Sequence, residues 1–160
     1  MKTLSVKQPW AFLLCAGIKD IENRTWKTNY RGRVFIHASG QSWIWSKVIN
    51  YLTPKMKEVF ENNKCTGTWL RNLQKGAIIG SVEIVDCVIN HPSIWAEKTD
   101  GVLVGNKFFT KEETKPVYNW VIANPILFAN PWLNIKGKLG LWEFENMKGI
   151  YDTTRVKNNQ

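Results

Sequence analysis

The chain has 160 residues, which is long enough for one domain to bury a core of its own. Its 22 Lys and Arg residues exceed its 13 Asp and Glu residues, and the formal net charge of +9 at pH 7 favours a polyanionic partner. The longest apolar run near the start, residues 10–18, is too short to span a membrane and lacks the layout of a signal peptide, so we expect a cytoplasmic protein without a membrane partner.

The first elements in chain order are predicted to be a strand and a short helix. Residues 3–7 alternate between apolar and polar side chains, as a strand does. Residues 8–17 form the helix, because Pro9 suits the first helical turn and Gly17 suits the left-handed position after the last turn. After a highly charged segment, residues 33–39 are predicted to form a buried strand.

Helices are expected in the next part of the chain. The stretch 42–63 is helical in character, and Pro54 divides it into two helices. Ser42 and Thr53 are candidate N-caps for these two helices. A further short helix, 68–76, ends at a glycine.

The second half of the chain is predicted to be mainly strand and loop. Residues 77–89 form the strongest predicted strand, with a bend or bulge at Gly80. Residues 90–116 indicate a loop with a short element or two, and residues 118–144 indicate two strands around a proline-bearing connection. Strands with helices inserted between them indicate an α+β domain, curved or closed into a β-barrel. We assign residues 1–147 to this single domain and residues 148–160 to a polar tail.

The charged segment 17–33 carries five cations, two carboxylates and two aromatic residues. In extended chain, Glu22, Arg24 and Trp26 point to one side, and Lys19 joins them only if the chain turns near Asp20. Lysine and arginine would donate hydrogen bonds to a phosphate or a carbonyl group, and the glutamate could hold a cation or accept from a base amino group. The alternative is a surface ion-pair network with a half-buried tryptophan.

Aromatic residues and further arginines extend this segment. Trp26 and Tyr30 offer flat surfaces on which unpaired bases stack, and the nine tryptophans of the chain could serve the core or such stacking. Arg31 and Arg33 are assigned to the same basic face, although solvated charges at a strand edge are an equal alternative.

Metal, cofactor and disulfide chemistry are not expected. The three cysteines are scattered without a C-x-x-C pair, and the histidines number two, so we predict free thiols and no metal site. His37, at the end of a predicted strand, is interpreted as a structural histidine rather than a catalytic base.

The segment from residue 8 to residue 39 closely resembles the ASCH domain family. The hallmark of that family, G-x-K-x-x-E-x-R, is matched here by Gly17, Lys19, Glu22 and Arg24. The flanks match too, with Gln8-Pro9-Trp10 before the motif and Trp26, Tyr30-Arg31-Gly32 and Ile36-His37-Ala38 after it. Residues 124–144 are similar to the closing strands of bacterial and phage members, so the resemblance covers most of the chain.

The resemblance implies a PUA-like β-barrel with the hallmark residues in a cleft between barrel and helix. It implies RNA or another nucleic acid as the partner, and the cations and aromatic residues of the segment favour a single strand or a nucleotide. Some small members hydrolyse acylated cytidine with a lysine, a threonine three residues later and a glutamate on a later strand. A ribonuclease activity is described for others.

This chain departs from the hydrolase pattern. Lys19 is present, but Glu22 stands at the threonine position, so that mechanism lacks its attacking atom. Glu83 is the candidate for the later glutamate, with an outward-facing strand residue as the alternative. A water activated by Glu22 or Glu83, with Lys19 stabilising the oxyanion, is chemically possible.

Three functions follow, in order of preference. The first is a binding module for nucleic acid, with a site formed by Lys19, Glu22, Arg24, Trp26, Tyr30, Arg31 and Arg33. The second is a hydrolase for acylated cytidine or RNA, with Lys19, Glu22 and Glu83 as its catalytic residues. The third is a protein-interaction domain in which the tryptophans form a docking patch.

Overall fold

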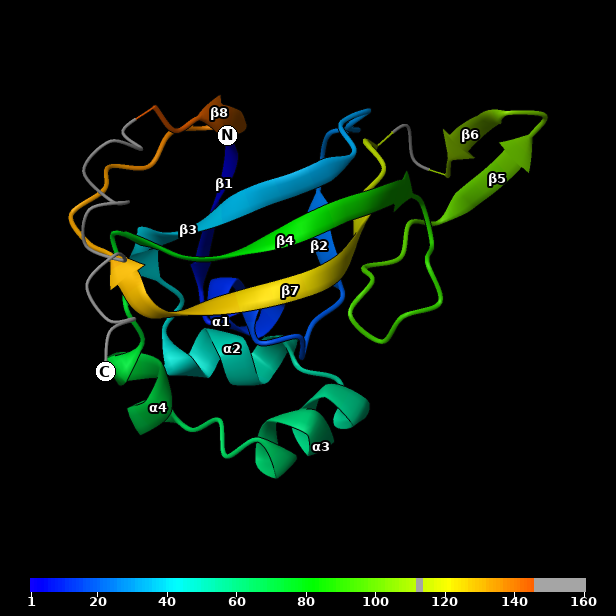
Figure 1. Cartoon of the computed structure of the whole chain (residues 1–160). Helices are drawn as coiled ribbons and strands as arrows, with labels where there is room; N and C mark the ends of the chain where they lie inside the picture. Colours follow the sequence, from blue (N-terminus) through cyan, green and yellow to red (C-terminus); the bar gives the residue numbers. More distant parts are fainter. Residues whose placement is uncertain (112–113, 146–160) are drawn as a thin grey trace.

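The structure is a computed structural model that describes residues 1–111 and 114–145 (Figure 1). The boundary at residue 147 and the predicted polar tail, 148–160, lie outside the described residues. No helix among the described residues is long and apolar enough to cross a membrane.

A six-stranded mixed sheet forms the body of the domain (Figure 1). In chain order, the first strand pairs in parallel with the third, and every other pair of neighbouring strands in this sheet is antiparallel. The strands, in spatial order, are β2 (Ile21–Arg24), β7 (Tyr118–Trp132), β4 (Ala77–Val88), β3 (Gly32–Ser42), β1 (Lys2–Gln8) and β8 (Leu141–Glu143). The α+β class is therefore confirmed, and closure of this sheet into a barrel stays a prediction.

A separate two-stranded hairpin lies in the region that was predicted to be mostly loop. It consists of β5 (Gly101–Val104) and β6 (Lys107–Thr110). Figure 1 shows this hairpin projecting from the end of the main sheet that lies away from β8. The short element expected in this loop is thus a hairpin.

The four helices of the described residues gather on one side of the sheet (Figure 1). They are α1 (Trp10–Cys15), α2 (Trp45–Tyr51), α3 (Pro54–Asn62) and α4 (Gly67–Asn72). Pro54 begins α3 and Thr53 caps it by accepting a hydrogen bond of 3.3 Å from the Met56 amide, as the sequence predicts. The division of this stretch at a proline is confirmed.

Ser42 is not the N-cap of α2, which corrects the sequence prediction. Ser42 pairs with Gln8 as the last residue of β3, and its hydroxyl donates to the backbone oxygens of Gln8 and Trp43. The helix is preceded instead by Ile44, which makes no side-chain cap. Pairing with β1 keeps the serine in the sheet and extends the strand beyond its predicted end.

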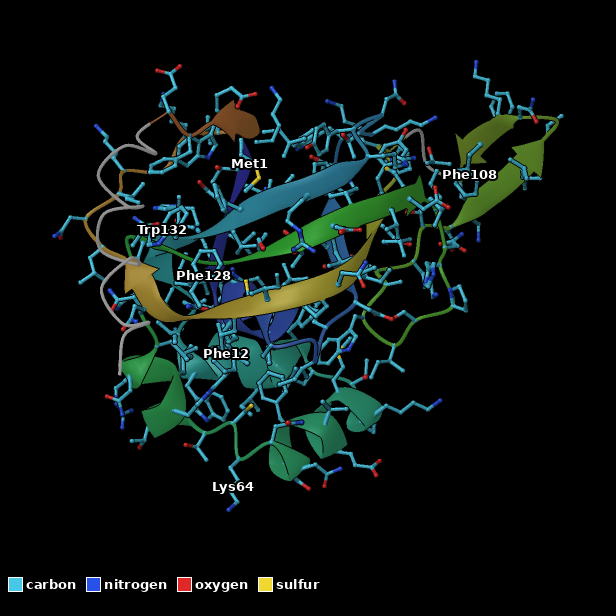
Figure 2. All side chains as sticks on the ribbon, viewed as in Figure 1. Met1, Phe12, Lys64, Phe108, Phe128 and Trp132 are labelled. Atoms are coloured by element: carbon cyan, nitrogen blue, oxygen red, sulfur yellow. The ribbon has the colours of Figure 1, made fainter. Side chains whose placement is uncertain are left out.

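Apolar side chains fill both faces of the sheet. Val34, Ile36 and Ala38 alternate along β3 and are fully buried in the larger cluster, on the helical side, as predicted. Phe35 points the other way and joins a smaller cluster with Ile78, Trp142 and Phe144. Figure 2 shows the two sides, with Phe12 toward the helices and Phe128 and Trp132 toward the opposite face.

Strand β7 continues through Pro125 and Pro131, at positions where the sequence predicts a connection between two strands. Pairing with β4 shifts register so that Asn124 and Pro125 together oppose Val82. Asn124 has a φ of 47° at this bulge. A proline cannot donate a ladder hydrogen bond, and a bulge removes the need for that donor. The two predicted strands are β7 and β8, but the prolines lie inside β7.

The bulge predicted at Gly80 is confirmed. Both neighbouring strands shift register beside this residue. A Cβ atom at Gly80 would lie 2.2 Å from the Ile126 backbone oxygen and 2.8 Å from Cys15 Sγ. Helix α1 and strand β7 therefore lie so close to the backbone of β4 that no side chain fits at position 80.

The segment between β7 and β8, residues 133–140, folds back over the smaller apolar cluster, and we call it the Leu139 loop. The Ile135 amide donates to the Gly76 backbone oxygen over 2.9 Å. His37 lies beneath the loop, with Nε2 2.7 Å from the Ile135 backbone oxygen and Nδ1 3.2 Å from Ser5 Oγ. His37 is buried, and its contacts match the structural role that the sequence analysis assigned to it.

Burial lowers the pKa of His37 below its ordinary value, although the hydrogen bond to Ile135 opposes this shift. The neutral ring is therefore favoured in the folded state. The stability that depends on the neutral His37 ring is fully present above the unfolded-state pKa of about 6.5. This stability is lost as the pH falls toward the lower folded-state pKa, by at most about 1.4 kcal/mol per pH unit. Urea unfolding between pH 8 and pH 5 should show less acid destabilisation in His37→Gln than in the wild-type chain. Equal slopes in the two proteins would contradict this role.

Candidate functional site

The motif segment is placed by the end of α1 and by the pairing of β2 with β7. Gly17 ends the helix with a φ of 75°, as predicted. The amides of Ile18 and Lys19 then both donate to the Leu13 backbone oxygen over 3.0 Å. This turn brings Lys19 to the same side as the residues of the strand that follows.

Glu22 lies between two cations at the centre of the site. Its Oε2 atom lies 3.3 Å from Lys19 Nζ, and its Oε1 atom lies 3.0 Å from Arg24 Nη2. Lys19 also donates to the Ile21 backbone oxygen, and Arg24 Nη2 donates to the Ser5 backbone oxygen over 2.9 Å. These contacts join the end of α1, strand β2 and strand β1.

The three charged residues differ in burial. Lys19 is 4% exposed and Glu22 is 7% exposed, whereas the Arg24 side chain retains 23% of its exposure. Burial lowers the pKa of Lys19, and the neighbouring Glu22 carboxylate opposes this shift. Arg24 is therefore the member of the group that solvent or a ligand reaches most easily.

These side chains line an open cavity of about 370 Å³, which we call the motif cavity. Its wall contains four cationic side chains, two carboxylates and three aromatic rings. The lining residues are Ser5, Val6, Lys7, Trp10, Lys19, Glu22, Asn23, Arg24, Ser39, Trp43, Tyr51, Glu97, Lys138, Leu139 and Gly140. The cavity thus combines polar groups fixed by β2 with aromatic surface from the helical layer.

Three aromatic rings pack edge to face at the cavity wall. The centroid of the Trp10 ring lies 5.2 Å from that of Trp43 and 5.1 Å from that of Tyr51. The Tyr51 hydroxyl donates to Glu97 Oε1 over 3.0 Å, so a hydrogen bond joins α2 to the loop after β4. Lys19 Nζ lies 5.9 Å from the Trp10 ring centroid.

Sequence reasoning did not identify most of this aromatic wall. Trp10 belongs to a flank of the motif, but no motif or spacing in the sequence singles out Trp43, Tyr51 or Glu97. These residues lie on segments that are distant in sequence from the motif and match no pattern. Only the fold brings them to the cavity.

Trp26 lies outside the motif cavity, although it follows Arg24 by two residues. Its ring packs at right angles to Trp120, with 4.5 Å between the centroids, and its backbone oxygen accepts from Trp120 Nε1 over 3.2 Å. Strand β2 ends at Arg24, so the alternation that would have kept Trp26 on the same side ends there too. The tryptophan is 36% exposed and covers the core beside β7.

The remaining predicted residues form separate contacts across the sheet. Arg33 donates to Glu83 Oε1 and to Ser81 Oγ over 3.1 and 2.9 Å, and also to the Asn124 backbone oxygen. The Asn124 side chain donates in turn to Glu83 Oε2. We call these four residues the Arg33 cluster; it ties the β7 bulge to β3 and β4, and none of its members lines the motif cavity.

Tyr30 and Arg31 also lie outside the lining of the cavity. The Tyr30 hydroxyl donates to the Arg33 backbone oxygen over 2.9 Å, and Arg31 lies 3.4 Å from Asp86. The structure therefore brings together Lys19, Glu22 and Arg24 in one cavity and places Trp26, Tyr30, Arg31, Arg33 and Glu83 elsewhere.

Within residues 1–111 and 114–145, no three His, Cys, Asp or Glu side chains come close enough to hold a metal ion. The three cysteines are buried free thiols, as the sequence analysis expects. Burial raises the pKa of Cys15 to about 12 and that of Cys65 to about 11, so both remain protonated at neutral pH.

Comparisons with known proteins agree with the motif. A family model of the ASCH domain matches residues 4–131. Two curated relatives, each named Activating signal cointegrator 1, from Mus musculus and Homo sapiens, are 36% identical to this chain over 93 residues. The match covers 53% of this chain and 14% of each relative, so the chain spans a small part of the length of those proteins.

Replacing Glu22 by glutamine should destabilise the fold strongly. The substitution leaves two cations, one of them fully buried, without their shared carboxylate, and breaking a buried ion pair costs about 3 kcal/mol or more. Glu83→Gln is the matched control, because its pair with Arg33 is about one-third exposed, and such pairs contribute about 1 kcal/mol or less. Urea unfolding followed by tryptophan fluorescence would measure both. Equal losses in the two variants would contradict a dominant role for the Glu22 pairs.

Proposed function

The chain belongs to the ASCH domain family, and we propose that it binds single-stranded RNA by taking one unpaired nucleotide into the motif cavity. ASCH domains are associated with RNA binding. The observation that carries the proposal is the convergence of Lys19, Glu22 and Arg24 on a cavity that also presents aromatic rings and exposed lysines.

The size and the walls of the cavity suit a nucleotide. Its volume of about 370 Å³ lies within the range of sites that bind small molecules. Sequence-specific RNA recognition relies on unstacked bases that pack on aromatic side chains and hydrogen-bond through their edges. Trp43 and Tyr51 would supply the apolar surface, and Glu22, held by its two cations, would supply fixed acceptors.

The positive charge at the mouth suits the phosphate groups of a strand. Lys7 on β1 and Lys138 in the Leu139 loop both line the cavity and are exposed. Each phosphate contact of this kind displaces counterions, so affinity depends on salt. Arg24, partly exposed, can add a further donor without losing its pair with Glu22.

RNA binding should depend on Lys138 and weaken as salt increases. Titration of tryptophan fluorescence with a short unstructured RNA at 50 and 200 mM salt should show affinity falling by about tenfold, with a shallower salt dependence for Lys138→Ala. Lys57→Ala is the matched control, since Lys57 is also an exposed lysine, lies on α3 and does not line the cavity. Absence of RNA binding at low salt, or equal effects of the two substitutions, would contradict the proposal.

Hydrolysis of a bound nucleotide in the same cavity is a second candidate function. The observation that favours it is the contact of Lys19 with Glu22 in the lining of the cavity, where burial also lowers the pKa of the lysine, because perturbed ionisable groups cluster at catalytic sites. A water activated by Glu22, with Lys19 stabilising the oxyanion, would supply the chemistry. Glu83 pairs with Arg33 outside the cavity and has no part in this version of the mechanism.

Incubation with acylated cytidines and with end-labelled RNA, followed by chromatography, tests this second candidate. The expected result is a product that forms with the wild-type chain and is reduced at least about a hundredfold in Lys19→Ala, as expected when an oxyanion-stabilising donor is removed. Circular dichroism would verify that the variant is folded. No product, or a product that persists at the wild-type rate in a folded variant, would remove hydrolysis from consideration.

A further inference from the structure

Leu139 stands out among the residues that line the motif cavity, because it is 98% exposed. An apolar side chain that is left in water contributes nothing to the core of its own protein. It lies in the Leu139 loop immediately after Lys138, one of the exposed lysines at the cavity mouth. The loop therefore presents an aliphatic tip and a cation side by side at the entrance.

The Leu139 loop is held firmly on both sides of this tip. Before the tip, Gly137 packs so closely on His37 and Ser5 that a Cβ atom there would lie 2.6 Å from the imidazole ring. After the tip, Gly140 adopts a φ of 68°, and Leu141 then pairs with Leu4 of β1. These constraints fix the backbone around Leu139, so its exposure is a property of the folded loop.

A lysine next to a leucine suits a nucleotide strand, because the lysine can bind a phosphate and the leucine can pack against a base. Cations bind phosphates, and in duplex DNA apolar side chains such as leucine insert at base steps that they partly unstack. When one base enters the motif cavity, the adjacent base in the strand loses the neighbour on which it stacked. Leu139 is the exposed apolar group that borders the cavity where that base would lie.

We propose that Leu139 packs against the base adjacent to the one in the motif cavity. This inference rests on the proposed function and restricts the class of ligand that fills the site. The ligand is then a strand with at least one neighbouring base, and a free mononucleotide occupies only part of the site. Lys138 holds the phosphate between the two bases.

The test compares two RNA pentamers that carry the same phosphates. One is a pentamer of adenosines, and the other has one central adenine with abasic sugars at the other four positions. The wild-type chain should bind the complete pentamer about tenfold more tightly, as burial of much of a leucine side chain predicts. Leu139→Ala should lose most of this preference, with its loss of affinity confined to the complete pentamer.

Leu103→Ala is the matched control, because Leu103 is 66% exposed and lies on the β5–β6 hairpin, outside the cavity lining. It should keep the wild-type preference for the complete pentamer. If Leu139→Ala keeps that preference too, or if the wild-type chain has no preference, the role of Leu139 is overturned while RNA binding stands. If the wild-type chain binds neither pentamer at low salt, the proposed function itself fails.

Discussion

The buried carboxylate of Glu22, shared between Lys19 and Arg24, is the interaction on which the rest of the site depends. A carboxylate that is 7% exposed is costly unless it is paired, and a fully buried lysine has the same requirement. Each charge is therefore tolerated because of the others. Since Arg24 also donates to the Ser5 backbone, the group joins β1, β2 and the end of α1, and these elements surround the cavity.

Because of this pairing, the buried cations of the motif and the exposed cations at the cavity mouth have different roles. Glu22 offsets one of the two positive charges of Lys19 and Arg24, so the motif supplies fixed hydrogen-bonding groups and one net positive charge. The exposed charge at the mouth comes from Lys7 and Lys138, which lie outside the motif in sequence. In our proposal the motif positions one nucleotide, while these lysines and Leu139 bind the strand that carries it.

Sequence reasoning succeeded where the determining signal is local. Gly17 ends α1, Thr53 caps α3, Gly80 marks a bulge, and the alternation along β3 buries the predicted face. It failed where tertiary pairing overrides a local signal, as at the prolines of β7, whose missing donors fall in bulges. It was incomplete for the site. Alternation along β2 would place Trp26 on the same side as Arg24, but β2 ends at Arg24 and the alternation ends there. The wall formed by Trp43 and Tyr51 depends on long-range packing that has no local pattern.

The most direct measurement of the central claim uses the indole N–H resonances of the tryptophans as reporters of position. Trp10 and Trp43 line the motif cavity, whereas Trp26 and Trp69 do not. In a titration of the ¹⁵N-labelled protein with a short single-stranded RNA, our account predicts that the signals of Trp10 and Trp43 shift and saturate together. Shifts of Trp26 in their place, or a spectrum unchanged by RNA at low salt, would contradict it.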